Sequence, residues 1–241
     1  MTTANPTPLD FRLAGPHRPR RRWWRAIRAL RELLAHPERT HLVFEMIRAL
    51  EPDERERALQ RLLAQPEGRR LFSARRSLGA ALLDRSALEG LPAGSFGRVY
   101  LDHMDRYGLD PAELVQLGRR TRADATVDDD LRWMSDRGAL THDLWHVLTN
   151  YGADPIGEAK LLWFSLAQLG GRVNLLLAVG TALRVTRVFG LRWLRDVFVA
   201  WRRGRRAIDL HAIPYEDLLA LPIEEVRAAL RIEPEASGTP R

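Results

Sequence analysis

Apolar residues recur along most of this chain with the spacing of an α-helix. Between residues 41 and 50, for example, Leu42, Met46 and Leu50 follow one another at intervals of four, which places them on one helical face. No stretch shows the apolar-polar alternation of a half-buried strand, and no Asn-Gly pair marks a hairpin turn. The sequence therefore predicts an all-α fold, built as a single compact multi-helix domain.

The polar and small residues at the two ends set the expected limits of that domain. We expect residues 1–36 to form a disordered N-terminal segment that ends in a basic amphipathic helix, residues 37–232 to form the helical domain, and residues 233–241 to be a disordered tail. A content of 45% hydrophobic and 29% charged residues is ordinary for a globular protein, and 241 residues can bury a substantial core.

The basic amphipathic helix of the N-terminal segment follows the run R-P-R-R-R-W-W. Trp23, Ile27, Leu30 and Leu34 fall on one of its faces, and arginines surround them. Such a helix can lie on an anionic membrane surface, because tryptophans favour the interface between water and lipid. A solvated helix packed on the domain is the alternative, and the sequence leaves both open.

The most apolar region, residues 161–183, is expected to form buried helices rather than a transmembrane span. Arg172 stands at its centre, and Gly170 and Gly171 interrupt it. An arginine at that depth would cost about 2.5–3.5 kcal/mol on membrane-insertion scales. The start of the chain also lacks the positive residues and apolar block of a signal peptide.

The charge balance and the absence of cysteine exclude some functions. The net charge is +7, from 38 basic and 31 acidic residues, which suits anionic membranes, phosphorylated ligands or nucleic acid. Outside the N-terminal helix we expect the arginines to be interleaved with Asp and Glu, without a basic stripe, and therefore expect no nucleic-acid binding. Because the chain has no cysteine, a bound metal would need His, Asp and Glu ligands.

One motif, H-D-L-W-H-V-L-T-N-Y-G-A-D-P-I-G-E at residues 142–158, carries the candidate chemistry. His142 and His146 point the same way on a helix, one turn apart, and Asp143 is rotated by about 100° from His142 but can still reach the same centre. Imidazoles and carboxylates together are good ligands for zinc, iron or manganese. Two helix ends that are polar by chance are the alternative.

The turn after the histidines brings a further carboxylate into reach. Residues 150–154 break the first helix, and Asp154 and Pro155 are a good N-cap and first residue for the next helix. A short connection makes the two helices antiparallel, so Glu158 comes back across from His146. Glu158 is one position too late for a capping box with Asp154, so helix capping does not explain it. The motif thus predicts a metal-binding helix-turn-helix.

Two other metal patterns fit less well. Zinc proteases use H-E-x-x-H, and Asp143 stands where that motif has Glu. Phosphohydrolases with a His-Asp pair need a further histidine upstream and an aspartate downstream. His103 and Asp209 are the residues that could take these two positions, but nothing in the sequence pattern supports that assignment.

The motif H-D-x-x-H followed by eleven residues and E resembles one family, the fourth protein of coenzyme Q (ubiquinone) biosynthesis. The resemblance covers about residues 37–232 and suggests a bacterial member. The chain departs from the family pattern at Asn150, where Gly is usual, but Asn also tolerates a left-handed turn. Further matching blocks are P-E-G-R-R-L-F at 66–72, L-P-A-G-S-F-G-R-V-Y at 91–100, I-G-E-A-K-L-L-W-F at 156–164 and W-R-R-G-R-R-A at 201–207.

This resemblance implies a set of site residues. Arg98 and Tyr100, in the second matching block, would contribute to the substrate cavity. The metal is usually described as zinc, with iron or manganese as alternatives, and no base apart from the metal site is assigned. The implied metal ligands are His142, Asp143, His146 and Glu158.

The resemblance also implies an activity and its setting. The activity is metal-dependent, oxidative decarboxylation at ring carbon 1 of a polyprenylated hydroxybenzoate. The implied partners are that quinone precursor, the other quinone-biosynthesis enzymes and a membrane surface, with a homodimer left open. The expected location is cytoplasmic, peripherally on the inner face of the membrane. The alternative is a non-catalytic, lipid-binding organiser of the enzyme complex, in which the metal is structural.

Overall fold

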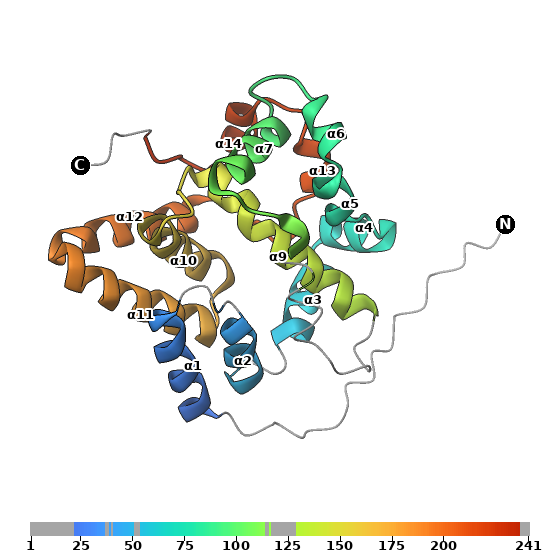
Figure 1. Cartoon of the computed structure of the whole chain (residues 1–241). Helices are drawn as coiled ribbons and strands as arrows, with labels where there is room; N and C mark the ends of the chain where they lie inside the picture. The colour runs from blue at the N-terminus through green and yellow to red at the C-terminus, as the bar shows by residue number, and fades with distance from the viewer. Residues whose placement is uncertain are drawn as a thin grey trace.

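The structure is a computed structural model that describes residues 22–36, 39, 41–50, 54–113, 116 and 129–236, apart from the side chains of 54, 55 and 131. These residues form helices and no strand, which confirms the predicted all-α fold (Figure 1). Of the predicted N-terminal segment (residues 1–36) and the predicted disordered tail (residues 233–241), residues 1–21 and 237–241 lie outside the described residues, whereas Glu235 of the tail contacts Asn150 and Lys160. The helices are α1 (Trp23–Ala35), α2 (His41–Leu50), α3 (Glu54–Ala64), α4 (Pro66–Ala74), α5 (Leu78–Leu83), α6 (Arg85–Glu89), α7 (Phe96–Tyr107), α9 (Asp129–Thr149), α10 (Pro155–Leu169), α11 (Arg172–Phe189), η1 (Leu191–Trp193), α12 (Leu194–Arg206), α13 (Tyr215–Leu218) and α14 (Ile223–Leu230).

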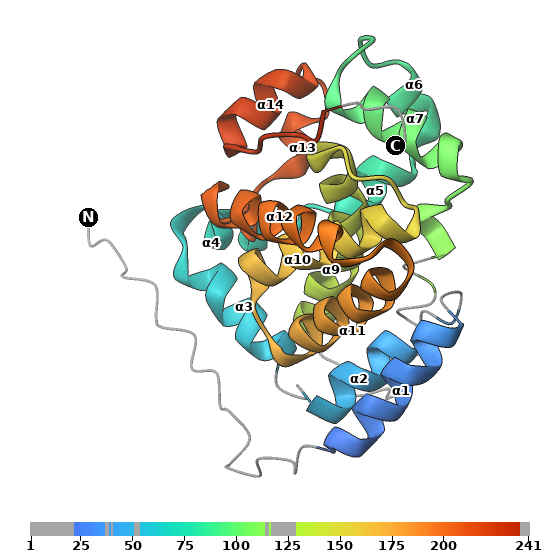
Figure 2. The same ribbon diagram turned by 90° about the vertical axis from the view of Figure 1, so that its left-hand side faces the viewer.

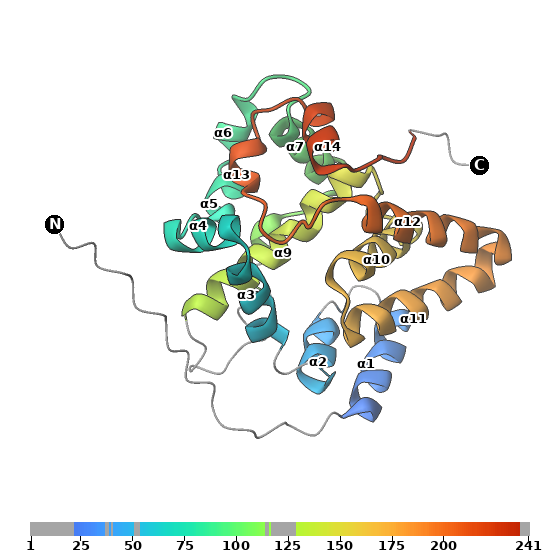
Figure 3. The ribbon, with the colours of Figure 1, turned by 180° about the vertical axis from the view of Figure 1, so that it is seen from behind.

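Helix α9 runs through the middle of the molecule, with other helices on several sides of it (Figures 1 and 3). Leu140, Leu144 and Leu148 recur at intervals of four on its inner face and are at most 1% exposed. The helix contacts α3, α5, α7 and α10. Burial of these apolar side chains favours the folded state and fixes the end of α9 that carries the two histidines of the motif.

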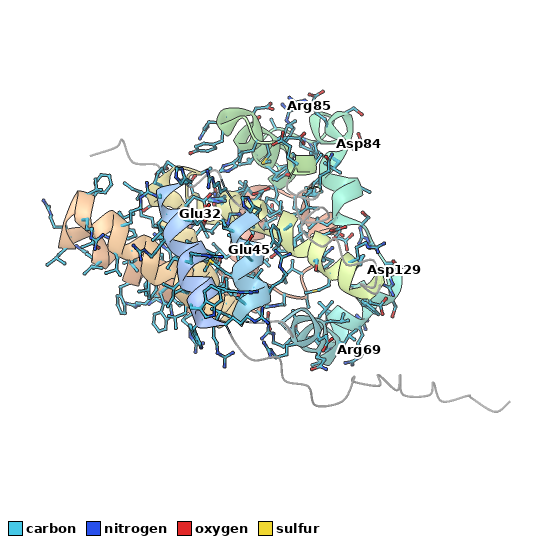
Figure 4. The ribbon with its side chains drawn as sticks, turned by 60° about the horizontal axis from the view of Figure 1, so that its bottom comes forward. Glu32, Glu45, Arg69, Asp84, Arg85 and Asp129 are labelled. Atoms are coloured by element: carbon cyan, nitrogen blue, oxygen red, sulfur yellow. The ribbon has the colours of Figure 1, made fainter. Side chains whose placement is uncertain are left out.

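Helix α1 packs against α2 and α11 through a face that contains two alanines and a leucine. Ala26, Ala29 and Leu30 are buried, whereas Trp23 and Ile27 stay 46% and 47% exposed. The predicted apolar face is therefore only partly buried, because the alanines allow a closer approach to neighbouring helices than the larger side chains would. In Figure 4, the labels Glu32 and Glu45 mark α1 and α2, which lie side by side.

The apolar region at residues 161–183 forms two helices that meet at a break, as predicted. Helix α10 ends at Leu169, and α11 begins at Arg172. Gly170 and Gly171 between them have φ angles of 63° and 87°, which glycine adopts at little cost. None of the helices in the described part of the chain is both long enough and apolar enough to cross a membrane.

Helices α11 and α12, joined by η1, form a helical hairpin over residues 172–206 that extends outward from the body in Figure 1 and lies on the side that faces the viewer in Figure 2. Helix α12 lies close against α10 at Gly204, where an added Cβ would stand 2.6 Å from the carbonyl oxygen of Phe164. Gln168 also donates a hydrogen bond from Nε2 to the Gly204 carbonyl at 2.6 Å. The close contact holds the hairpin to the helix that carries Glu158.

A buried ion pair joins α9 to the C-terminal helix α13. Nη1 of Arg137 lies 2.6 Å from Oε1 of Glu216, and both side chains are 5% exposed. The guanidinium also donates to the carbonyl of Ile213 at 2.7 Å, so its burial is compensated by good partners.

The division of the chain into an N-terminal segment (residues 1–36), a helical domain (residues 37–232) and a tail (residues 233–241) remains a proposal.

Candidate metal centre

The two histidines of the motif lie near the end of α9. The helix is continuous through Gly138 and ends at Thr149, so His142 and His146 stand one turn apart on a rigid support. Their ring centroids are 4.8 Å apart, with an interplanar angle of 73°. His146 is 1% exposed, whereas the His142 side chain is 38% exposed. One imidazole is therefore fixed in the interior, and the other borders the solvent.

The turn between α9 and α10 has the geometry that the sequence predicts. Asn150 is left-handed, with φ of 57°, and its Nδ2 donates to the carbonyl of Glu235 at 2.8 Å. Asp154 caps α10, because its Oδ1 accepts from the N–H groups of Ile156 and Gly157 at 2.9 and 3.2 Å.

A glycine lets the turn close tightly on itself. An added Cβ at Gly157 would stand 1.9 Å from the carbonyl oxygen of Gly152, so no larger residue fits there. The carboxylate that follows, Glu158, lies in the first turn of α10. The turn thereby returns this carboxylate to the two histidines.

Three of the predicted ligands form a compact group. His142, His146 and Glu158 each offer one ligand atom such that all these atoms lie within 4.8 Å of one another. Nε2 of His146 is 3.2 Å from Oε1 of Glu158, and Nε2 of His142 is 3.7 Å from Oε2. One metal ion can bind two imidazoles and a carboxylate at this spacing. The proposed centre thus has three side chains converging from two helices.

The orientation of His146 fits a metal ligand. Its Nδ1 lies 3.1 Å from the carbonyl oxygen of Tyr151, and because a carbonyl only accepts, Nδ1 carries a proton. Nε2 faces Glu158, and this buried atom has no hydrogen-bond partner among the described residues. A second hydrogen bond at Nδ1 is the usual way to orient a metal-binding histidine, and it leaves Nε2 as the atom that can bind an ion together with the Glu158 carboxylate.

Asp143, the fourth predicted ligand, lies outside the compact group. Its Oδ1 is 3.5 Å from Nδ1 of His142, and the residue is 8% exposed. A carboxylate beside Nδ1 orients the ring and directs Nε2 towards the centre. Burial favours the neutral imidazole, but the carboxylates of Asp143 and Glu158 outweigh it and raise the pKa of His142 to about 9.

The electrostatics of Glu158 also favour the charged form. Burial alone would raise the pKa of this carboxyl group. The imidazoles of His146, His142 and His103 more than offset burial and hold the pKa below its usual value. Glu158 is therefore an anion at neutral pH and suited to bind a cation.

Helix α7 carries two further buried polar atoms, and the one on His103 lies against this centre. The ring of His103 stacks on His146, with centroids 5.6 Å apart, and contacts Tyr107 at 4.8 Å. The Nε2 of His103 and the hydroxyl of Tyr100 are both buried and have no hydrogen-bond partner among the described residues. Buried polar atoms without partners are rare in folded proteins, so these two are available to a bound ligand.

Burial and neighbouring charges set the protonation of Tyr100 and His103. Burial, with Asp143 as the second cause, keeps the Tyr100 hydroxyl protonated by raising its pKa. Burial and the neighbouring His146 lower the pKa of His103 to about 4, so its ring is neutral at pH 7. His103 can therefore either accept or donate one hydrogen bond at Nε2, depending on the tautomer.

The structure shows no contact between Arg98 and the side chains of His142, His146 or Glu158 among the described residues. Nη1 of Arg98 donates to the carbonyl of Glu89 at 2.6 Å and so fixes the loop before α7.

Local sequence reasoning missed His103 as a site residue, because its neighbours in the centre lie about forty positions away in the chain. The signal that could have found it is its position one turn after Tyr100, on the same face of a helix.

Comparison with known proteins identifies the family. The model of the family "Coenzyme Q (ubiquinone) biosynthesis protein Coq4" matches residues 16–236, which is most of the chain. The chain belongs to the Coq4 family. This confirms the resemblance inferred from the His-Asp motif.

Several curated members of the Coq4 family are distant relatives of this chain. A mouse protein, "Ubiquinone biosynthesis protein COQ4 homolog, mitochondrial", is 31% identical over 173 residues, which is 70% of this chain and 62% of the mouse protein. A relative from Pyricularia oryzae is 29% identical over 180 residues, covering 72% of this chain and 55% of that protein. The matched part is thus under two thirds of the length of these relatives.

A solved structure has the same fold. It is a crystal structure from Nostoc punctiforme PCC 73102 whose name assigns it provisionally to ubiquinone biosynthesis. It superposes with a TM-score of 0.65 at 22% identity and covers 86% of this chain and 96% of that chain. At this identity, the likeness supports the Coq4 fold alone.

Proposed function

We propose that this Coq4 protein removes the carboxylate from ring carbon 1 of a polyprenylated hydroxybenzoate, in a metal-dependent and oxidative reaction of ubiquinone biosynthesis. The observation that carries the proposal is the compact group of His142, His146 and Glu158 beside the ring of His103, whose buried Nε2 has no hydrogen-bond partner among the described residues. Side chains that can bind a metal ion, next to a hydrogen-bonding atom without a partner, suit an aromatic ligand that carries several oxygen atoms on its ring.

Each part of the centre has a role in this proposal. His142, His146 and Glu158 would hold the ion, and Asp143 would orient His142. When bound, a divalent ion supplies a Lewis acid for the carboxylate or phenolic oxygens of the ring. Zinc fits the ligand types, and iron or manganese would fit as well.

The α7 residues would position the ring. The hydroxyl of Tyr100 and Nε2 of His103 can hydrogen-bond to ring oxygens, which satisfies two buried atoms that otherwise lack partners. In the oxidative decarboxylation, one oxygen atom of dioxygen would bond to ring carbon 1, the bond between that carbon and the carboxylate would break, its electron pair would restore the aromatic ring, and carbon dioxide would leave. The other oxygen atom of dioxygen would leave as water, which needs protons and a source of electrons, for which another quinone-biosynthesis enzyme is the proposed partner.

The test measures ring precursors in a strain that lacks this protein and is complemented with variants. With His146→Ala or Glu158→Gln, we expect the carboxylated precursor to accumulate and ubiquinone to fall at least about tenfold, while the levels of the other pathway enzymes stay normal. The control is Glu67→Gln, because this carboxylate is 62% exposed and lies on α4, away from the centre.

The alternative function is a non-catalytic, lipid-binding organiser of the enzyme complex. That role predicts that the same variants deplete the partner enzymes together with ubiquinone, without a build-up of the carboxylated compound. Wild-type rates of ubiquinone formation in both variants would refute the decarboxylase proposal.

A further inference from the structure

The α11–α12 hairpin carries a charge unlike that of the rest of the chain. Residues 172–206 contain nine arginines and one aspartate, a net charge of +8, so the rest of the chain is slightly acidic in a total of +7. The expected interleaving of arginine with Asp and Glu therefore fails in this segment. The structure places this charge on an arm that extends from the body, opposite the labelled Asp84, Arg85 and Asp129 in Figure 4.

The end of the hairpin is also apolar. Its tip, defined here as Val188, Phe189, Leu191, Leu194 and Phe198, consists of five large apolar side chains that are 72%, 54%, 73%, 45% and 55% exposed. A cluster of this kind at the end of a protruding element is unusual for a surface that only meets water. The tip therefore needs a partner surface.

Arginines surround the tip and are free to bind anions. Arg187, Arg192, Arg195 and Arg202 are exposed, and none of them forms an ion pair within the described part of the chain. The guanidinium of Arg202 lies 5.9 Å from the ring centroid of Phe198, so cationic and apolar groups alternate closely. Apolar side chains that enter a bilayer, with arginines at the level of the headgroups, bind anionic lipid.

We propose that the tip of the α11–α12 hairpin inserts into the surface of an anionic phospholipid bilayer, with the surrounding arginines on the lipid phosphates. A second copy of the chain is a poorer occupant, because a symmetric contact across the tip would bring two strongly basic hairpins together. The sequence offered α1 as a membrane helix, with a solvated helix packed on the domain as the alternative. However, α1 buries Ala26, Ala29 and Leu30 against its neighbours.

The hairpin is packed against the helix turn that carries Glu158. Ala182 and Val185 of α11 and Trp193 of η1 form one buried cluster with Ala159, which follows Glu158 in α10. Nε1 of Trp193 donates to Oγ1 of Thr186 at 2.8 Å, which holds the hairpin turn in shape. On the proposed function, a docked tip would hold the metal group close to the bilayer that contains the polyprenyl tail.

The test is co-sedimentation of the full chain with vesicles of phosphatidylcholine alone or with added phosphatidylglycerol. We expect binding to the anionic vesicles that weakens with salt. Leu191→Asp should lower it about tenfold or more, since it removes an inserted side chain and adds a repelled charge. Arg192→Gln should lower it about fivefold. Their controls are Leu83→Asp, an apolar residue 46% exposed on α5, and Arg70→Gln, 82% exposed on α4.

Three results would overturn the proposal. One is wild-type vesicle binding by Leu191→Asp, and another is loss of binding in Trp24→Ala of α1 while the tip variants still bind. The third is a change in oligomeric state in the tip variants, measured by light scattering without vesicles, with vesicle binding intact. Metal content in Leu191→Asp should equal that of the wild type, so failure of membrane docking and failure of the metal centre are distinguishable.

Discussion

At the scale of single residues, the most informative atom is Nε2 of His103. It is buried, it has no partner among the described residues, and its ring stacks on His146. Burying an imidazole nitrogen without a hydrogen bond costs about 1–3 kcal/mol. Such a cost is commonly met at sites where a ligand completes the hydrogen bond, so His103 belongs with the ligand-binding wall of the centre.

Replacing His103 with phenylalanine should therefore weaken ligand binding and leave the metal in place. Phe keeps the ring stack but cannot hydrogen-bond, so the affinity of the metal-loaded protein for 4-hydroxybenzoate should fall about tenfold. Titration calorimetry measures this affinity. Asp102→Asn, an exposed neighbour on α7, is the matched control. An affinity for 4-hydroxybenzoate equal to that of the wild type would remove His103 from the site.

At the scale of elements, the turn between α9 and α10 determines the geometry of the centre. Asp154 accepts two backbone N–H groups at the start of α10, one turn before the chain presents Glu158. Asp154→Ala should destabilise the fold by about 1 kcal/mol in urea unfolding, because it removes the N-cap. It should also weaken metal binding, because the first turn of α10 then frays.

Asp154→Ser separates the cap from the charge of Asp154. Serine caps a helix but carries no charge, so both stability and metal affinity should return to near the wild-type values. If Asp154→Ser binds metal as weakly as Asp154→Ala does, then the carboxylate itself rather than the cap supports the centre.

At the scale of the whole molecule, the buried pair of Arg137 and Glu216 connects α9 to the C-terminal helices. Arg137→Met should lower the free energy of unfolding by about 3–5 kcal/mol, since it leaves Glu216 charged and buried without its partner. The double variant Arg137→Met with Glu216→Leu should recover much of that loss, because neither charge remains. Urea unfolding that finds the double variant as unstable as the single one would show that other contacts of Arg137 dominate.

What could be predicted from the sequence was local in the chain. The helix that carries His142 and His146, the cap at Asp154 and the return of Glu158 all depend on residues within one stretch, where periodicity and capping chemistry are directly legible. The family of the chain followed from the same stretch, and the comparisons confirm it.

What could not be predicted depends on tertiary packing. The approach of His103 to His146 joins two helices that are distant in sequence. Periodicity alone also does not tell which apolar side chains stay exposed, as Trp23 of α1 and Leu191 of η1 do. These outcomes depend on which neighbour each helix finds, and small residues such as Gly204 decide that by allowing close contact.

The central claim is that His142, His146 and Glu158 hold a metal ion, and metal analysis of the purified protein tests it most directly. The account predicts about one equivalent of a divalent transition metal in the wild type and in His103→Phe. It predicts loss of that metal in His146→Ala and Glu158→Gln, with the helical content unchanged by circular dichroism. If these two folded variants hold as much metal as the wild type, the ion is bound elsewhere and the account is wrong.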